Sequence, residues 1–116
     1  MRSIRVDQFE FPEPGSEEAL EIDFSRMSEF PHPDVRSFVR STVGIDAAAA
    51  LPAAKPFHSV TGKEEASEYM KRFADIEVPQ HCDWPTHVLS DESWDAVHLV
   101  ICGPKFFIRY RWSTSA

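Results

Sequence analysis

Two runs of β-branched and aromatic residues near the C-terminus constrain the fold of this chain most strongly. The first run covers residues 94–102 and the second covers residues 106–112, with Gly103, Pro104 and Lys105 between them. Runs of this composition form strands, and a short connection that contains Gly and Pro turns the chain back on itself. The sequence therefore predicts an antiparallel β-hairpin at the C-terminus.

The second strand of this hairpin has two different faces, because side chains alternate along a strand. Its larger apolar side chains share one face, and Phe107, Arg109 and Arg111 share the other. An aromatic side chain beside two arginines is typical of a binding surface. Alternatively, a helix covers this face, so that Phe107 belongs to a second core layer and the arginine stems pack along it.

Shorter alternating runs predict the remaining strands. Residues 4–9 alternate between apolar and polar positions, and residues 86–89 are expected to form a short strand. Residues 20–24 place three apolar side chains inward and the carboxylates of Glu21 and Asp23 outward. The sheet is therefore expected to contain about four or five strands.

Apolar residues at helical spacing predict two helices. One covers residues 34–43, where Asp34 is a suitable N-cap residue. The other covers residues 61–74 and begins with a capping box headed by Thr61. The alanine- and proline-rich stretch 46–56 is expected to form one or two further helical turns.

The order of these elements predicts the class of the fold. Strands and helices are segregated along the chain and the connections are short, which is typical of α+β proteins. We expect a mostly antiparallel sheet of about four or five strands, two or three helices packed on one face, and the C-terminal β-hairpin. A chain of 116 residues is the usual length of one domain, so residues 1–116 are expected to form a single domain.

The charge of the chain restricts its partners. The formal net charge is −7, from 19 acidic and 12 basic residues. This balance argues against nucleic acid as a partner, because phosphate binding needs a cationic surface. Acids dominate residues 1–34, whereas residues 103–116 contain three basic residues and no acid. One interpretation is that the two ends of the chain lie together and neutralise each other.

The sequence also indicates where the protein works. Cys82 and Cys102 are too few to form a disulfide framework. The first residues lack the apolar core of a signal peptide, and no stretch approaches the ~20 apolar residues that span a bilayer. We therefore expect a cytoplasmic protein with free thiols and no membrane partner.

Side chains that can bind a metal ion or take part in catalysis are densest in residues 81–87. His81 and Asp83, together with His87 or His98, have the composition of a facial triad, in which two imidazoles and a carboxylate hold a metal ion. Such sites usually take the second histidine from a distant strand of a barrel, and this chain has too few strands to close one. A polar surface loop is the simpler interpretation, so no cofactor is expected and the metal site is the alternative.

No pattern in the sequence predicts catalysis. His98 and Cys102 share a strand face, but four residues at about 3.3 Å each separate them by about 13 Å, beyond hydrogen-bond reach. Adjacent carboxylates such as Glu64 and Glu65 point apart and do not converge as an acid and a base. The sequence also lacks a phosphate-binding loop and the common hydrolase and metalloprotease motifs.

We therefore expect a small acidic protein-binding domain without catalytic activity, for example an inhibitor or immunity-type protein with a basic partner. The alternative is a small metal-dependent enzyme that uses the His/Asp cluster at 81–98. For either function, the edge of the C-terminal hairpin is a candidate homodimer interface. The candidate partner-binding residues are Glu21, Asp23, Asp91, Glu92, Phe107, Arg109 and Arg111.

Overall fold

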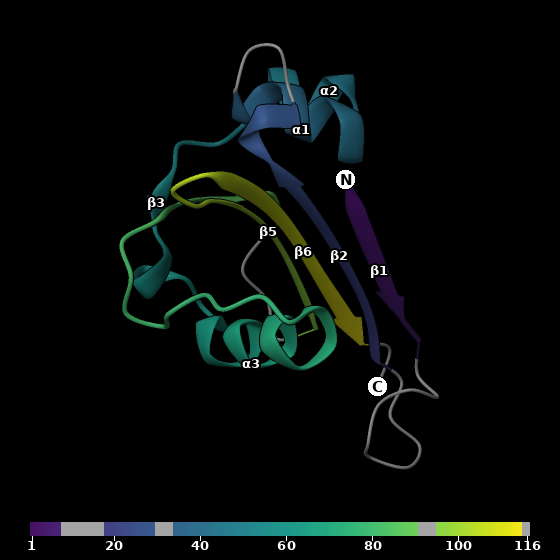
Figure 1. The fold of residues 1–116 in the computed structure, drawn as a ribbon, viewed down its shortest axis with the longest axis vertical. Helices are drawn as coiled ribbons and strands as arrows, with labels where there is room; N and C mark the ends of the chain where they lie inside the picture. Colours follow the sequence, from purple (N-terminus) through teal and green to yellow (C-terminus); the bar gives the residue numbers. More distant parts are fainter. Residues whose placement is uncertain (8–17, 30–33, 91–94, 115–116) are drawn as a thin grey trace.

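A six-stranded antiparallel sheet in the order β1-β2-β6-β5-β4-β3 forms the frame of the protein (Figure 1). The computed structural model describes residues 1–7, 18–29, 34–90 and 95–114. The strands are β1 (Arg2–Val6), β2 (Glu18–Arg26), β3 (Lys55–Pro56), β4 (Pro85–Val88), β5 (Ala96–Cys102) and β6 (Phe106–Thr114). The α-helices are α1 (Val35–Thr42), α2 (Ile45–Ala49) and α3 (Lys63–Ala74), and two 3-10 helices cover Met27–Glu29 and Phe57–Ser59.

The α+β class with an antiparallel sheet is confirmed, but the described residues form six strands instead of four or five. The additional strand is β3, in which Lys55 and Pro56 pair with Thr86 and Pro85. A strand of two residues has no alternation that a sequence pattern could detect. The stretch 46–56 thus contains most of the short helix α2 and this strand.

The C-terminal hairpin is confirmed and lies inside the sheet. β5 pairs with β6 from Cys102 opposite Phe107 to Ala96 opposite Ser113. At the turn, a side chain on Gly103 would come within 2.4 Å of the Phe106 ring, so this position needs glycine. β6 also pairs with β2, and β5 also pairs with β4. Neither strand of the hairpin has a free edge, so the predicted homodimer interface at the hairpin is wrong.

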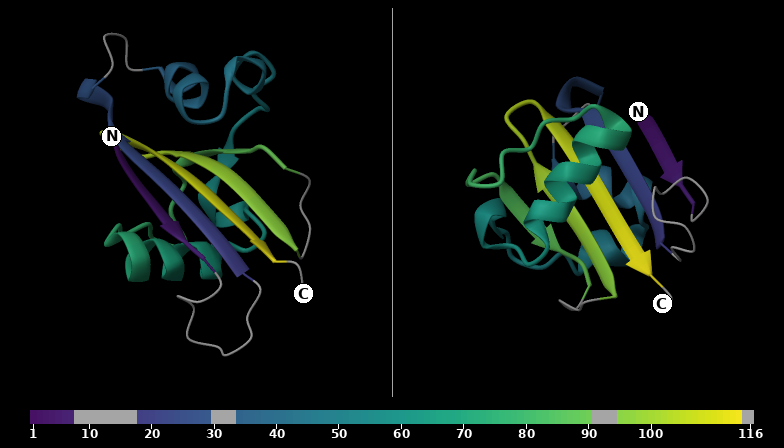
Figure 2. Two further views of the ribbon diagram at one scale, coloured as in Figure 1. Left: turned by 90° about the vertical axis from the view of Figure 1, so that its right-hand side faces the viewer. Right: turned by 90° about the horizontal axis from the view of Figure 1, so that it is seen from below.

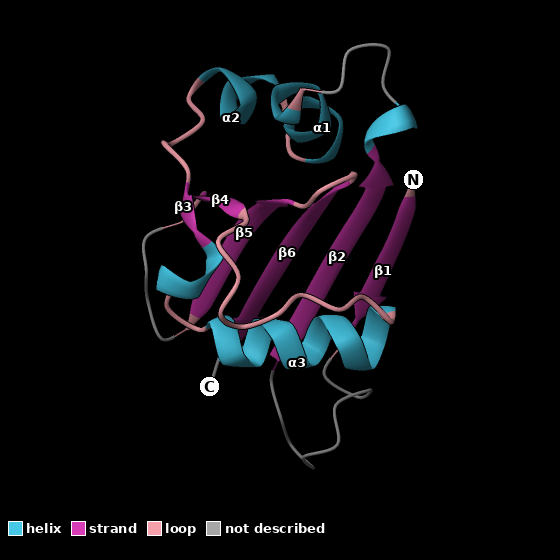
Figure 3. Cartoon of the chain, turned by 60° about the vertical axis from the view of Figure 1, so that its left-hand side comes forward, coloured by secondary structure: helices cyan, strands magenta, loops and turns pink. Residues whose placement is uncertain are grey.

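Helices cover both faces of the sheet, and not one face as expected (Figures 2 and 3). We call the face that packs against α3 the first face. Its core includes the following buried residues: Leu20, Ile22, Tyr69, Met70, Leu99, Ile101, Ile108 and Tyr110. α1 and α2 pack on the opposite side, which we call the second face, where Phe38, Val39, Ala48, Val100 and Phe107 form a separate core.

The capping residues predicted for the two helices are confirmed for α1 and not for α3. Asp34 caps α1 as predicted, since its Oδ1 accepts a hydrogen bond from the backbone N–H of Arg36 at 3.0 Å. The capping box at Thr61 is wrong, because α3 begins at Lys63. Its N-cap residue is Gly62, which has a φ of 84° and no side chain to accept a cap hydrogen bond. Glycine adopts this left-handed conformation without strain.

Glu18 ties α3 to the sheet. Its Oε1 accepts hydrogen bonds from the Tyr69 hydroxyl of α3 at 3.1 Å and from the Trp112 indole of β6 at 3.0 Å. Both aromatic side chains belong to the core of the first face.

None of the helices in the described segments has the length and apolar composition of a membrane span.

Phe107 provides a test of the second core. It is 2 % exposed, and its ring centroid lies 5.4 Å from that of Phe38. The substitution Phe107→Ala should lower the free energy of unfolding by about 3 to 5 kcal/mol, because it leaves a cavity in a packed core. Urea denaturation followed by circular dichroism measures this change. Ile45→Ala is the control, because Ile45 is 68 % exposed and should shift stability by less than about 0.5 kcal/mol. A loss at Phe107 as small as that would contradict a core role.

Candidate functional site on the second sheet face

Strand alternation gathers polar side chains from four strands on the second face. The sheet register places residues of β1, β2, β6 and β5 side by side in two neighbouring rows. One row contains Arg5, Glu21, Arg111 and His98. The next row, closer to α1, contains Ser3, Asp23, Arg109 and Val100.

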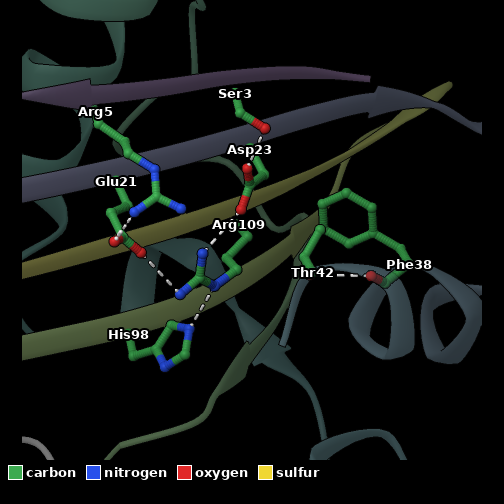
Figure 4. Close-up of polar contacts among 8 residues, drawn as sticks. All are labelled: Ser3, Arg5, Glu21, Asp23, Phe38, Thr42, His98 and Arg109. Atoms are coloured by element: carbon green, nitrogen blue, oxygen red, sulfur yellow. Dashed lines mark hydrogen bonds and ion pairs between the residues drawn. The ribbon is translucent and has the colours of Figure 1, made fainter. Parts of the chain in front are cut away.

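Arg109 is the centre of this group (Figure 4). Its side chain is 8 % exposed, and its guanidinium donates to three neighbours. Nη1 lies 2.8 Å from Asp23 Oδ2 and Nη2 lies 3.2 Å from Glu21 Oε2. Nε lies 2.9 Å from His98 Nε2. A guanidinium this deeply buried needs such partners, because removing an isolated charge from water is unfavourable by several kcal/mol.

The two carboxylates also have partners on β1. Glu21 Oε1 accepts a hydrogen bond from Arg5 Nη1 at 2.8 Å, and Asp23 Oδ1 accepts one from Ser3 Oγ at 2.6 Å. The ion pairs of Glu21 and Asp23 with Arg109 confirm, for these three residues, the interpretation that the two ends of the chain neutralise each other. The physical cause is the sheet order, which places β2 next to β6.

His98 is neutral at physiological pH. Burial, followed by the charges of Arg109 and Arg111, lowers its pKa to about 4. Because Nε2 accepts a hydrogen bond from Arg109, the ring proton lies on Nδ1. A protonated ring would instead present two N–H donors and a positive charge to the guanidinium.

Serine, histidine and carboxylate groups meet here without forming a catalytic triad. In a triad the histidine bonds to the nucleophile on one side and to the acid on the other. Here Arg109 lies between His98 and Asp23, and Ser3 donates to the carboxylate. His98 therefore has no position from which to take the proton of Ser3, and the group acts as an ion-pair network.

The covering helices leave part of this face accessible. α1 and α2 pack on the end that carries Val100 and Phe107. Beyond that end Arg111 is exposed, the Arg5 side chain is 79 % exposed and the Glu21 side chain is 29 % exposed. We call the row formed by Arg5, Glu21, Arg111 and His98 the open half of the second face.

The predicted partner-binding residues therefore separate into distinct groups. Phe107 and Arg109 are buried, and Asp23 is nearly buried, with 14 % of its side chain exposed. Glu21 and Arg111 reach the surface. Asp91 and Glu92 lie outside the described residues.

The structure does not bring the predicted metal ligands together. His81 and Asp83 are exposed in the segment before β4. His87 Nδ1 lies 2.6 Å from the carbonyl oxygen of Pro52, and His98 accepts from Arg109. Within the described ranges, no group of three or more His, Cys, Asp or Glu side chains is placed to hold a metal ion.

Cys102 shares the second face with His98 but lies at its covered end. It packs against the second core. Burial, with a smaller effect of the Asp34 charge, raises the pKa of the Cys102 thiol to about 11. The thiol is therefore protonated at neutral pH and is a poor nucleophile.

Sequence reasoning missed Arg5 and Ser3. The alternation in residues 4–9 indicated that Arg5 lies on the face opposite Ile4 and Val6. That pattern could not identify Glu21 as its neighbour, because the neighbour depends on which strand pairs with β1. The same uncertainty hid the pairing of Asp23 with Arg109.

Comparisons of the chain with family models, with curated proteins and with solved structures find no match. The assignment of a function therefore depends on the geometry of the site.

Replacing Arg109 tests the ion-pair network. Arg109→Met should lower the free energy of unfolding by about 3 kcal/mol, the lower end for buried pairs, since Glu21 retains some contact with water. Combining it with Asp23→Asn should restore part of the loss, and a double-mutant cycle from urea denaturation measures the coupling. Arg5→Gln, at an exposed pair, should change stability by less than about 1 kcal/mol. Additive effects of Arg109→Met and Asp23→Asn would contradict the network.

The depressed pKa of His98 predicts how stability depends on pH. The ordinary pKa of 6.5 applies to the unfolded chain, and the folded value is about 4. Between these two values the unfolded chain binds more protons, so stability falls as the pH drops from 6.5 towards 4. His98→Gln keeps an acceptor for Arg109 and does not titrate, so this variant should lose less stability over that range. NMR titration of the ring and denaturation at each pH measure both effects, and parallel pH profiles of the two proteins would contradict the prediction.

Proposed function

We propose that this chain is a protein-binding domain without catalytic activity, and that it binds its partner through the open half of the second face. The proposal depends on the exposure of Arg111 and on its lack of a polar partner among the described residues. Arg111 is exposed, and within the described part of the chain its side chain has no ion pair or hydrogen bond. Its cross-strand neighbour Glu21 is already bound by Arg5 and Arg109.

An exposed arginine on a rigid surface suits protein recognition. Arginine is one of the residue types that dominate binding energy in protein interfaces. The network beside Arg111 holds its cross-strand neighbours Glu21 and His98 in place, so this part of the surface needs little rearrangement on binding. Small side chains from the next row, Ala19, Ser113 and Ala96, continue the surface beside it. A partner surface can approach the strand backbone closely there.

The charges on the open half indicate which groups the partner presents at the interface. Arg111 and Arg5 flank Glu21, so a complementary surface presents carboxylates to the two arginines. The net charge of −7 acts over longer distances and favours a partner of net positive charge. Glu21 and Asp23 contribute little to that attraction because Arg109 and Arg5 together neutralise them.

An inhibitor or immunity-type protein is the concrete version of this proposal. Such a protein needs an ordered surface that blocks its target and needs no catalytic groups of its own. We place it in the cytoplasm, where the thiols of Cys82 and Cys102 would stay reduced, as the two residues are free cysteines.

Comparing two arginine variants tests the surface. Arg111→Ala should weaken binding of the partner by about 30-fold, the effect of a hot spot of about 2 kcal/mol. Arg40→Ala removes the same charge from the exposed side of α1 and should change binding by less than about threefold. Quantitative mass spectrometry of proteins captured from source-cell lysate identifies the partner, and calorimetry with the purified partner gives the affinities. If every captured protein binds the two variants equally, the open half is not the binding surface.

A further inference from the structure

The two edges of the sheet differ in how they are protected. At one edge, β3 has only two residues, and its Pro56 lies opposite Pro85 of β4. Short strands and prolines are the usual means of preventing pairing with another chain. At the other edge, β1 has five residues and contains no proline or glycine. Among the described residues, β1 pairs only with β2, so its outer backbone groups have no strand partner there.

The charged side chains of β1 do not protect its outer edge. Arg2 donates to the carbonyl oxygen of Ala74 in α3, and its guanidinium lies 5.5 Å from the centroid of the Phe24 ring. Arg5 reaches across its own sheet to Glu21, as Figure 4 shows. Both guanidinium groups are therefore directed towards β2 and α3, away from the edge.

We propose that β1 is the interface of a homodimer, in which two copies pair their β1 strands antiparallel about a two-fold axis at Ile4. In this register Ile4 faces Ile4 of the second copy, Ser3 faces Arg5, and Arg2 faces Val6. No like charges face each other directly, which is the arrangement that cross-strand pairing requires. The outer N–H and C=O groups of β1 would gain hydrogen bonds, and the two sheets would join into one.

Charge complementarity on the second face supports this register. Within one copy, the row from β6 to the edge contains Arg111, Glu21 and Arg5. Across the proposed axis, Arg5 meets the second copy's row, which begins with Ser3 and continues with Asp23 and Arg109. The charges along the joined row therefore alternate in sign through the interface. Arg5, which already pairs with Glu21 of its own copy, faces Ser3 of the second copy, and Asp23 of that copy lies one strand further along the row.

The first face supports the same register through its apolar side chains. Val6 is 4 % exposed, and Ile4 is a half-buried residue that packs against the first core. Pairing at Ile4 brings the two Ile4 side chains together, so that the second copy covers apolar surface left open in one copy. The apolar surface covered by each α3 would then continue across the axis.

The interface is small, because five residues of each copy form it. We therefore expect a weak dimer that dissociates on dilution, in the range of about 1 to 100 μM. Sedimentation velocity of the whole chain at physiological salt, from low micromolar to several hundred micromolar protein, measures it. A shift from monomer to dimer over this range is expected. A monomer at every concentration overturns the proposal.

Cysteine cross-linking tests the register itself. In Ile4→Cys the two cysteines face each other with Cα atoms about 4.5 to 5.5 Å apart, which a disulfide accepts. In the control Ser3→Cys the two cysteines are diagonal neighbours at about 7 to 8 Å, too far for a good disulfide. Mild oxidation should therefore link Ile4→Cys through residue 4 of both copies, as peptide mass spectrometry would identify. Equal linkage in the control, or linkage only through Cys82 or Cys102, overturns this register.

A charge variant provides a second, independent measurement. Arg5→Glu places a carboxylate near Asp23 of the second copy at two symmetric positions, so the dimer should weaken about tenfold. Arg40→Glu makes the same change of net charge on α1 and should leave the dimer unchanged. Circular dichroism verifies that both variants are folded. Equal dimerisation of the two variants overturns the role of Arg5.

Discussion

The buried guanidinium of Arg109 is the interaction on which the second face depends. It joins β6 to β2 through Asp23 and Glu21 and to β5 through His98. A buried ion pair adds little stability compared with apolar residues of the same size, but an unpaired buried charge is strongly unfavourable. A slip of one residue between β2 and β6 would turn the carboxylates to the other face and leave the guanidinium without them. The network therefore selects one register among the pairings that apolar residues alone would tolerate.

Much of the local structure could be predicted from residue patterns. Alternation in residues 106–112 correctly separated the apolar face from the face with Phe107 and Arg109, and Asp34 was correctly identified as a helix cap. The strand order could not be predicted, because any of several alternating runs can pair with β6. As a result, Phe107 had two open interpretations, and the one with a covering helix is confirmed by the Phe38 contact.

In the candidate site, too, the sequence pattern predicted which face of a strand each side chain lies on, but it did not predict which side chains contact each other. Glu21 and Asp23 were correctly placed on the face opposite Leu20 and Ile22, but whether they are exposed depends on residues about 90 positions away, such as Arg109. Arg111 has the same residue type and lies on the same face, but it lies beyond the end that α1 and α2 cover and is exposed. Sequence spacing cannot tell these two arginines apart, since burial by α1 and α2 makes the difference.

The central position of the last strand has a consequence for synthesis of the chain. The pairing of β2 with β6 joins residues 18–26 to residues 106–114, so the middle of the sheet is assembled from the two ends of the sequence. A growing chain on the ribosome can form the helices and the shorter strand pairs. The first core stays incomplete until β6 emerges, because β6 joins β2 to β5 and contributes residues to that core. Closing so long a loop is slow compared with local contacts. The apolar faces of β2 and α3 therefore stay exposed to solvent until β6 has been synthesised. During this time the nascent protein is most prone to aggregation.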